Sequence, residues 1–213
     1  MEPTKTELDY KDYVIKDGKL VGAFEEMYQK VDNPWNQMSM QYILDSRRIL
    51  AQAWCNKLKM QGTFNNVVEL GCGFGNMTGM LALDGFNVTG VDISQTAIDK
   101  AKEYNPENNF VVGDVKDFNV VSNLNPDIII MAELTWYMLD FLDDFIVNLK
   151  SYAKYKQVYL IHLLTTYDDG VQKYGKDKFS DLDGILKYFD MNYLEYGYIQ
   201  SGNSQGTFFV ASL

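Results

Sequence analysis

The stretch Val68-Glu69-Leu70-Gly71-Cys72-Gly73-Phe74-Gly75 decides the fold. It places three glycines at every second position, after a short apolar run at residues 66–70 and before a helical pattern at residues 77–83. The first glycine permits a tight turn, the second lets a ligand approach the backbone, and the third lets the helix pack close to the strand. A purely structural turn is the competing interpretation. The order strand, turn, helix instead predicts an α/β sheet with a ligand site at the end of its first strand.

On both sides of this stretch, apolar runs typical of buried strands alternate with helical patterns. Further strands are expected at residues 87–92, 110–112, 127–131 and 158–164, and further helices at residues 95–104, 141–153 and 181–189. Continuous apolar runs predict a parallel sheet that is covered by helices. The last two strands, at 193–199 and 207–213, flank a turn-rich segment at 200–206 and must run antiparallel. We therefore expect a Rossmann-like, doubly wound α/β sheet, mostly parallel, with a reversed C-terminal strand and α-helices on both faces.

The chain ahead of the sheet divides into a cap and a helix. Residues 1–36 mix charged and aromatic side chains and carry turn signals at Asp17-Gly18 and Asn33-Pro34, so we expect an N-terminal helical cap or lid there. From residue 36 to 59, apolar residues recur at helical spacing without glycine or proline, which predicts one long amphipathic helix. The expected organisation is a lid at residues 1–36 and one domain at residues 37–213.

Two aspartates follow predicted strands at the same edge of the sheet. Asp92 ends the second strand, 21 residues after Gly71, where a carboxylate can accept both hydroxyls of an adenosine ribose. Asp114 comes directly after the third strand and suits an adenine amino group. A structural role, as negative charges near helix N-termini, is the alternative for both. With the glycines, these aspartates predict a nucleoside site.

These motifs together resemble the class I S-adenosylmethionine-dependent methyltransferases. The resemblance covers about residues 66–164 and rests on the glycine stretch, on Val91-Asp92-Ile93-Ser94 with the helix after it, and on Gly113-Asp114. It implies S-adenosylmethionine as cofactor and S-adenosylhomocysteine as product. It further implies that Gly71 and Gly73 line the methionine moiety, and that Glu69 orders the loop or meets the amino group through water. The candidate cofactor-binding residues are Glu69, Gly71, Cys72, Gly73, Asp92, Ile93, Asp114 and Val115.

The acceptor side of the site is predicted from the ends of the fourth and fifth strands, where ligands of open α/β sheets bind. Glu133 and His162 are the candidate general bases, and a neutral imidazole near pH 7 favours His162. A buried structural histidine is the alternative. The stretches Asn33-Pro34-Trp35-Asn36-Gln37 and Gln172-Lys173-Tyr174-Gly175 are similar to small-molecule methyltransferases of bacterial capsule, sugar and secondary-metabolite pathways. The candidate substrate or lid residues are Trp35, Trp136, Tyr137 and Tyr174.

Charge and composition exclude several partners. The formal net charge of −10 disfavours binding to nucleic acid and to anionic membrane surfaces. No apolar run approaches the roughly 20 residues of a membrane helix, and Cys55 and Cys72 form no CxxC pair. We expect a cytoplasmic protein, a monomer or homodimer, that acts on nitrogen or oxygen of a small-molecule acceptor. No carboxylate triad of the metal-dependent catechol methyltransferases is present, so no metal is expected.

Other functions remain as alternatives. A dehydrogenase would favour the pattern GxGxxG, and Asn76 follows Gly75 here. The motif of two prolines and an aromatic residue that holds a flipped base is absent, which disfavours nucleobase methylation. A protein methyltransferase and a non-catalytic, cofactor-binding regulatory subunit both stay open.

Overall fold

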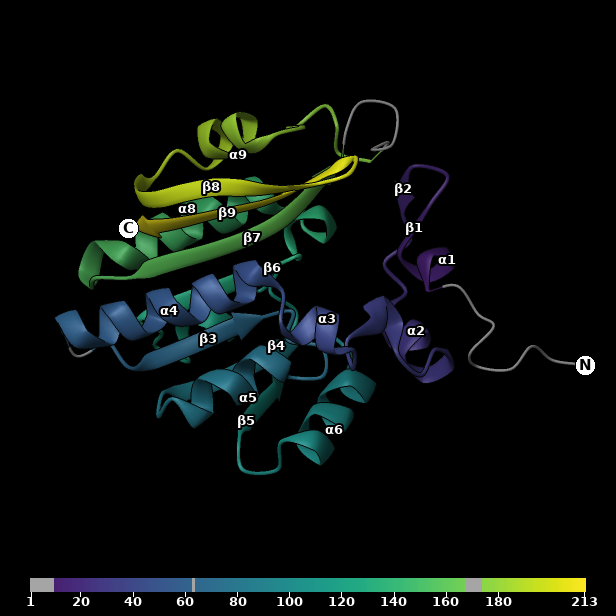
Figure 1. Cartoon of the computed structure of the whole chain (residues 1–213), viewed down its shortest axis with the longest axis horizontal. Coiled ribbons are helices and arrows are strands. Elements are labelled where there is room, and N and C mark those ends of the chain that lie inside the picture. The colour runs from purple at the N-terminus through teal and green to yellow at the C-terminus, as the bar shows by residue number, and fades with distance from the viewer. Residues whose placement is uncertain (1–9, 63, 168–173) are drawn as a thin grey trace, which may run out of the picture.

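The computed structural model describes residues 10–62, 64–167 and 174–213, and every structural statement below concerns these ranges. The main sheet is formed by β3 (Asn66–Leu70), β4 (Asn87–Asp92), β5 (Asn109–Val112), β6 (Ile128–Ala132), β7 (Tyr159–Tyr167), β8 (Asn192–Ser201) and β9 (Ser204–Ser212). Its strand order is β5-β4-β3-β6-β7-β9-β8 (Figure 1). The chain therefore winds outward from β3 in both directions, as predicted for a doubly wound sheet.

The strand directions confirm the mostly parallel sheet. The strands β3 to β7 pair in parallel, whereas β9 is antiparallel to both of its neighbours, β7 and β8. The reversed strand is thus inserted between two strands that share one direction. The predicted turn at residues 200–206 is too long, because pairing of β8 with β9 continues to Ser201 and Ser204.

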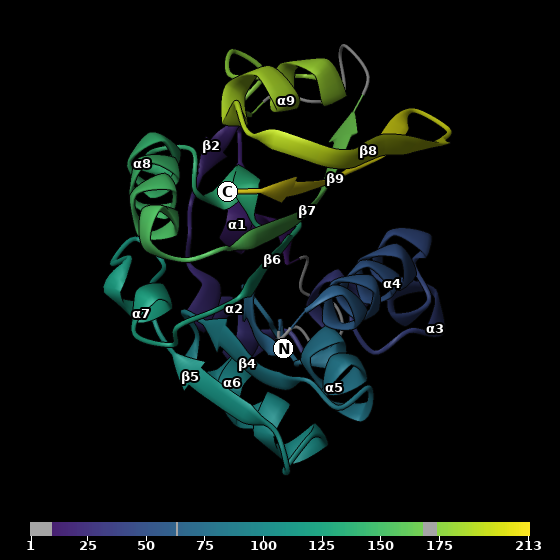
Figure 2. The ribbon, with the colours of Figure 1, turned by 90° about the vertical axis from the view of Figure 1, so that its left-hand side faces the viewer.

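Helices cover both faces of the sheet. One layer contains α4 (Ser46–Gln61), α5 (Asn76–Leu83) and α6 (Gln95–Tyr104), and the other contains α7 (Asn119–Ser122), α8 (Leu142–Tyr152) and α9 (Leu182–Phe189) (Figure 2). Side chains of β6 alternate between the layers. Ile128 and Ile130 belong to the core under α4 and α5, and Ile129 and Met131 to the core under α8 and α9. Burial on both faces explains why this strand is a continuous apolar run.

Residues 10–36, which we call the cap, lie beyond the carboxyl ends of the parallel strands (Figure 1). The cap contains α1 (Lys11–Val14), β1 (Ile15–Lys16), β2 (Lys19–Leu20), α2 (Phe24–Lys30) and the 3-10 helix η1 (Pro34–Asn36). Its apolar side chains pack against Phe74 and Ala97. The predicted cap residues 1–9, and Gln172 and Lys173 of the second motif, lie outside the described residues. In the described ranges, no helix has the length and hydropathy required to cross a bilayer.

The single helix predicted for residues 36–59 is wrong. The structure divides this segment into α3 (Met40–Ile43) and α4, and Asp45 caps α4 by accepting a hydrogen bond from the Arg47 backbone N–H. Leu44 keeps the apolar spacing across the break, so periodicity alone did not reveal it. The break leaves Asp45 and Arg47 at a helix start, beside the cavity at the sheet edge.

Candidate active site

A cavity of about 900 Å³ lies between the cap and the carboxyl edge of the sheet. This volume is near the upper end of the roughly 300–1,000 Å³ typical of ligand pockets, which leaves room for a nucleoside cofactor and a small acceptor. Four predicted site residues, Glu69, Cys72, Gly73 and His162, do not line it. The predicted residues that do line it are Trp35, Gly71, Asp92, Ile93, Asp114, Val115, Glu133, Trp136, Tyr137 and Tyr174.

The glycine loop between β3 and α5 has a backbone that requires glycine. Gly71, Gly73 and Gly75 have φ values of 69°, 52° and 73°, in the left-handed region that other residues rarely adopt. A Cβ atom at residue 71 would lie 2.9 Å from the Leu134 side chain, and one at residue 75 would lie 2.5 Å from the Phe110 ring. Close packing therefore adds to the conformational requirement at both positions.

Gly73 is predicted to let a ligand approach the backbone, but in the structure a side chain of the protein lies against it. A Cβ atom there would collide with Gln37 Oε1 and would lie 2.9 Å from the Tyr28 hydroxyl oxygen. The group that approaches this glycine in the structure is therefore a side chain of the protein itself. Sequence spacing cannot reveal this contact, because Gln37 lies 36 residues upstream.

Asp92 links the glycine loop to the end of β4. Its two carboxylate oxygens accept hydrogen bonds from the backbone N–H of Gly73 at 2.9 Å and of Ser94 at 3.0 Å. Burial raises the pKa of Asp92 above its usual value, and these N–H donors oppose that shift. A carboxylate accepts about four hydrogen bonds, so acceptor capacity remains beside the N–H groups of Gly73, Ser94 and Ile93, and the residue lines the cavity. Asp114 also lines the cavity and accepts the Lys116 backbone N–H at 2.9 Å.

Glu69 and Cys72 face the protein interior. The Glu69 carboxylate accepts the Thr78 backbone N–H at 2.8 Å and the Thr78 hydroxyl at 2.5 Å, and burial raises its pKa. This contact supports the predicted ordering of the loop and leaves the side chain away from the cavity. Cys72 packs with Ile98 and Phe110, so it has a core position instead of the predicted ligand contact.

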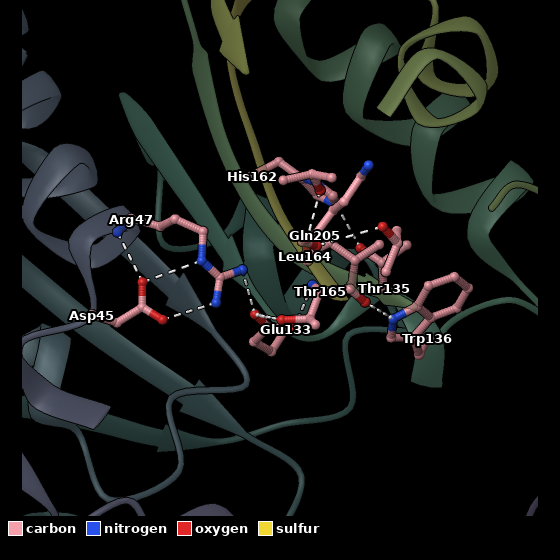
Figure 3. A network of polar contacts seen from close by, with 11 residues as sticks. Asp45, Arg47, Glu133, Thr135, Trp136, His162, Leu164, Thr165 and Gln205 are labelled. Atoms are coloured by element: carbon pink, nitrogen blue, oxygen red, sulfur yellow. Dashed lines mark hydrogen bonds and ion pairs between the residues drawn. The ribbon is translucent and has the colours of Figure 1, made fainter. Parts of the chain in front are cut away.

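On the acceptor side, Arg47 bridges two carboxylates, and we call Asp45, Arg47, Glu133 and Thr165 the arginine clasp (Figure 3). Arg47 Nη2 lies 2.9 Å from Asp45 Oδ2, and Arg47 Nη1 lies 2.7 Å from Glu133 Oε1. Thr165 donates its backbone N–H and its hydroxyl to Glu133, both at 2.8 Å. The clasp thereby joins the start of α4 to the ends of β6 and β7.

Glu133 is at the cavity as expected, but its surroundings disfavour the predicted role as a base. Its carboxylate already contacts three donor groups, from Arg47 and Thr165, which occupy most of its acceptor positions. Its φ of 59° is in the left-handed region, a strained conformation that is frequent at functional sites. This geometry favours a structural part in the cavity wall.

His162 does not reach the cavity, so the structure contradicts its prediction as the base. The imidazole is fully buried, stacks on Phe209 at a centroid distance of 4.6 Å, and contacts Phe189. Its Nε2 lies 2.7 Å from Thr135 Oγ1 (Figure 3). Burial, with a smaller contribution from Arg47, lowers the pKa of His162 to about 3. The side chain points into the layer beneath α9, which fits the alternative of a structural core histidine.

Aromatic side chains from the cap and from the end of β6 meet above the cavity. The ring of Trp35 lies 5.3 Å from that of Tyr10 and 6.2 Å from that of Tyr137, centroid to centroid. Trp136 packs against Phe179 and donates its indole N–H to the Thr165 carbonyl at 2.8 Å. The predicted lid residue Trp35 is thus at the junction of cap and domain.

A carboxylate on α2 anchors the cap to α6. Glu25 accepts hydrogen bonds from the Ser94 hydroxyl at 2.6 Å and from the Thr96 backbone N–H and hydroxyl at 3.1 and 2.7 Å. Burial opposes ionisation, but these hydrogen bonds lower the pKa of Glu25 to about 2. Because Ser94 follows Asp92 closely, the anchor lies beside the predicted ribose site.

Replacing Glu25 with glutamine should loosen the cap. The variant loses a negative charge at the N-terminus of α6, and we expect amide exchange in α2 to accelerate about fivefold, equivalent to roughly 1 kcal/mol. Glu26→Gln is the matched control, because Glu26 pairs with the exposed Lys30 on the same helix. Hydrogen exchange monitored by mass spectrometry tests this, and equal acceleration in both variants would contradict the anchor.

Several polar residues that line the cavity were given no site role from the sequence, among them Gln37, Tyr42 and Arg48. Arg48 is 6% exposed, and its guanidinium lies 4.0 Å from the centroid of the Tyr42 ring. In the described ranges, no carboxylate forms an ion pair with it. The available signal was a pair of adjacent arginines near a helix start in an acidic chain.

Comparison with known proteins identifies the middle of the chain. Residues 67–154 match the family described as methyltransferase domain. A ubiquinone biosynthesis O-methyltransferase of Rickettsia bellii is 25% identical over 156 residues, which cover 64% of this chain and 59% of that protein. The chain thus spans less than two thirds of the length of the curated relatives that it matches.

Solved structures share the fold at low sequence identity. The N-methyltransferase NodS from Bradyrhizobium japonicum WM9, in complex with S-adenosyl-L-homocysteine, has a TM-score of 0.64 at 16% identity and covers 88% of this chain and 96% of its own. Magnesium protoporphyrin IX methyltransferase from Synechocystis PCC 6803 with bound S-adenosylmethionine has a TM-score of 0.56 at 18% identity, covering 96% and 97%. Both chains share the α/β architecture described above.

Proposed function

We propose that this chain, which belongs to the class I S-adenosylmethionine-dependent methyltransferase family, binds that cofactor in the cavity and methylates nitrogen or oxygen of a small molecule. One observation carries the proposal. The glycine loop and the carboxylates of Asp92 and Asp114 meet at one cavity, at the carboxyl edge of a parallel sheet. This is where a doubly wound fold binds a nucleoside.

The nucleoside half of the cofactor fits the residues after β4 and β5. Asp92 retains acceptor capacity for a ribose hydroxyl beside the backbone N–H groups that it already accepts. Asp114 is suited to the adenine amino group, and Ile93 and Val115 supply apolar surface for the base. These assignments keep the cofactor-binding residues predicted from the sequence, except Glu69, Cys72 and Gly73, which do not line the cavity.

The amino-acid tail of the cofactor fits Arg48. Arg48 forms no ion pair among the described residues, although the nearby carboxylates of Glu69 and Asp45 attract it. Its guanidinium can therefore bind a further anion, and the tail carries a carboxylate. Gly71 of the glycine loop lines the same cavity, so the tail would lie along that loop. Arg48 thereby adds a residue that the sequence motifs did not include.

The protein's contribution to chemistry is alignment and water exclusion. When bound, S-adenosylmethionine supplies a methyl group that its sulfonium makes electrophilic. The arginine clasp fixes one wall of the acceptor space, and Trp35 and Tyr137 close it from the cap side. Glu133 is occupied by its donors and His162 is buried beneath the wall, so we assign no general base to this chain.

The acceptor is proposed to be small because the cap covers the cavity with aromatic side chains. A peptide acceptor needs an open cleft, and a regulatory subunit needs no acceptor space. An acceptor from a bacterial capsule, sugar or secondary-metabolite pathway is proposed from the Asn33-Pro34-Trp35 resemblance. A curated relative is named as an O-methyltransferase, and a structural relative is named as an N-methyltransferase. These names support either oxygen or nitrogen as the acceptor atom.

The direct test is binding followed by transfer. Isothermal titration should give one site for S-adenosylmethionine and one for S-adenosylhomocysteine. Transfer of isotopically labelled methyl groups to a library of amines, phenols and sugars should then identify an acceptor that saturates. Absence of binding of either nucleoside would remove the proposal, and labelling of added proteins alone would favour the protein methyltransferase.

Replacing Arg48 with methionine should lower the affinity for S-adenosylhomocysteine by about 10- to 100-fold, because the tail carboxylate loses a charge-assisted hydrogen bond. The free energy of unfolding should change little, since Arg48 forms no ion pair among the described residues. Lys57→Met is the control, since Lys57 lies on the same helix and contacts the Trp54 ring. Titration calorimetry with urea unfolding checks both quantities. Unchanged affinity in Arg48→Met would exclude Arg48 from the tail site.

A further inference from the structure

Gln37, directly after the cap, is a buried polar residue, 3% exposed, that is hydrogen-bonded to both the cap and the glycine loop. Its Oε1 accepts the Phe74 backbone N–H at 3.0 Å, and its Nε2 donates to the Tyr28 hydroxyl at 3.0 Å. Its backbone carbonyl accepts the Asn76 side-chain N–H at 2.9 Å. One residue thus connects the cap to the loop at two points.

The loop is shaped to receive this side chain. A Cβ atom at residue 73 would collide with Gln37 Oε1, so glycine at that position is required by the contact as well as by its positive φ. The loop and Gln37 are therefore mutually dependent. A change on either side would move the backbone of Gly73 and Phe74, close in the chain to Gly71, which lines the cavity.

Gln37 also completes a set of protein acceptors around the start of α5. Asp92 accepts the Gly73 N–H, Gln37 accepts the Phe74 N–H, and Glu69 accepts the Thr78 N–H. N–H groups at a helix start commonly bind anions when they are free. Since side chains already occupy these three donors, an anionic group in this cavity cannot bind to them, and Arg48 is a cationic partner at the same cavity.

We propose that Gln37 is a positioning residue for the amino-acid tail of the cofactor. It holds the glycine loop in the left-handed conformation along which the tail lies, and it keeps the tail carboxylate away from α5, toward Arg48. The inference rests on the proposed cofactor site. It concerns the tail and leaves the nucleoside contacts of Asp114, Ile93 and Val115 unchanged.

Two ligands that differ in the tail separate this role from general stabilisation. S-adenosylhomocysteine carries the amino acid, and 5′-methylthioadenosine carries the same nucleoside without it. In Gln37→Leu, which removes both side-chain hydrogen bonds, we expect about a tenfold or greater loss of affinity for the first ligand and less than about threefold for the second. The Phe74 amide should also lose protection from hydrogen exchange.

Gln52→Leu is the matched control, because Gln52 makes a tertiary hydrogen bond to Asp84 and does not line the cavity. It should leave both affinities unchanged. If Gln37→Leu does not fold, Tyr28→Phe removes the partner hydroxyl at nearly constant volume, and the same selective loss is expected at about two- to fivefold.

The outcomes distinguish the two proposals. If the unmodified protein binds neither ligand, the cofactor site itself fails. If it binds both, and the Gln37 variant loses both equally or neither, the positioning role is overturned while the cofactor site stands. A selective loss of the ligand that carries the tail supports the positioning role.

Discussion

Replacing Asp92 with asparagine is expected to weaken S-adenosylhomocysteine binding by about 10- to 100-fold, the equivalent of one or two lost charge-assisted hydrogen bonds. Both oxygens of Asp92 accept a backbone N–H, from Gly73 and from Ser94. An asparagine has one acceptor oxygen, and its amide group would face an N–H donor. The ribose hydroxyls would therefore lose an acceptor. Titration calorimetry measures the change directly.

The choice of asparagine follows from the structure. Alanine at residue 92 would leave two buried N–H groups unpaired, so it would lower stability and affinity together. Asp99→Asn is the control, since Asp99 lies on α6 and pairs with the exposed Gln95. Wild-type affinity in the Asp92 variant, with a folded protein, would remove the nucleoside assignment.

Local sequence signals were sufficient for most of the fold. The helix predicted at residues 95–104 has the observed bounds of α6, because Ser94 accepts the Ala97 backbone N–H and caps its start. The apolar run at residues 127–131 predicted β6 to within one residue at each end. In contrast, the break between α3 and α4 depends on one capping aspartate inside an apolar pattern. Periodicity averages over several residues and so hides such a break.

The sequence predicted which residues line the cavity best at strand ends, and less well where the direction of a side chain decides whether it reaches the cavity. Asp92 and Glu133 end or follow strands and line the cavity. His162 is on β7 too, but successive residues of a strand point to opposite faces, and its face is covered by α9. Position along a strand alone does not fix which layer receives the side chain.

Contacts between distant segments could not be read from the sequence at all. Gln37 approaches Gly73, and Arg47 packs against Gly206, where a Cβ atom would lie 2.8 Å from the guanidinium Nε. In the sequence, the aliphatic stem of Arg47 fits the apolar spacing of the predicted helix. Only the fold brings its charged end between Asp45 and Glu133. These tertiary contacts shape part of the cavity wall.

His162 should make the protein's stability depend on pH. Burial lowers the pKa of the folded imidazole to about 3, whereas an unfolded histidine titrates near 6.5. Above the unfolded value the imidazole is neutral in both states, and its contribution to stability is fully present. As pH falls below about 6.5, the unfolded chain gains a proton that the folded protein cannot bind, so stability is lost at about 1.4 kcal/mol per pH unit.

The comparison with His162→Gln isolates this effect, because glutamine can reach Thr135 and does not titrate. Other titrating groups contribute equally to both proteins and cancel in the difference between their unfolding free energies. We expect this difference to shrink by about 2 kcal/mol from pH 6.5 to pH 5. Urea unfolding over this range provides the measurement. A difference independent of pH would mean that the folded imidazole takes up protons normally. His162 would then be accessible to the cavity, and the structural interpretation of this residue would have to give way to a role as a base.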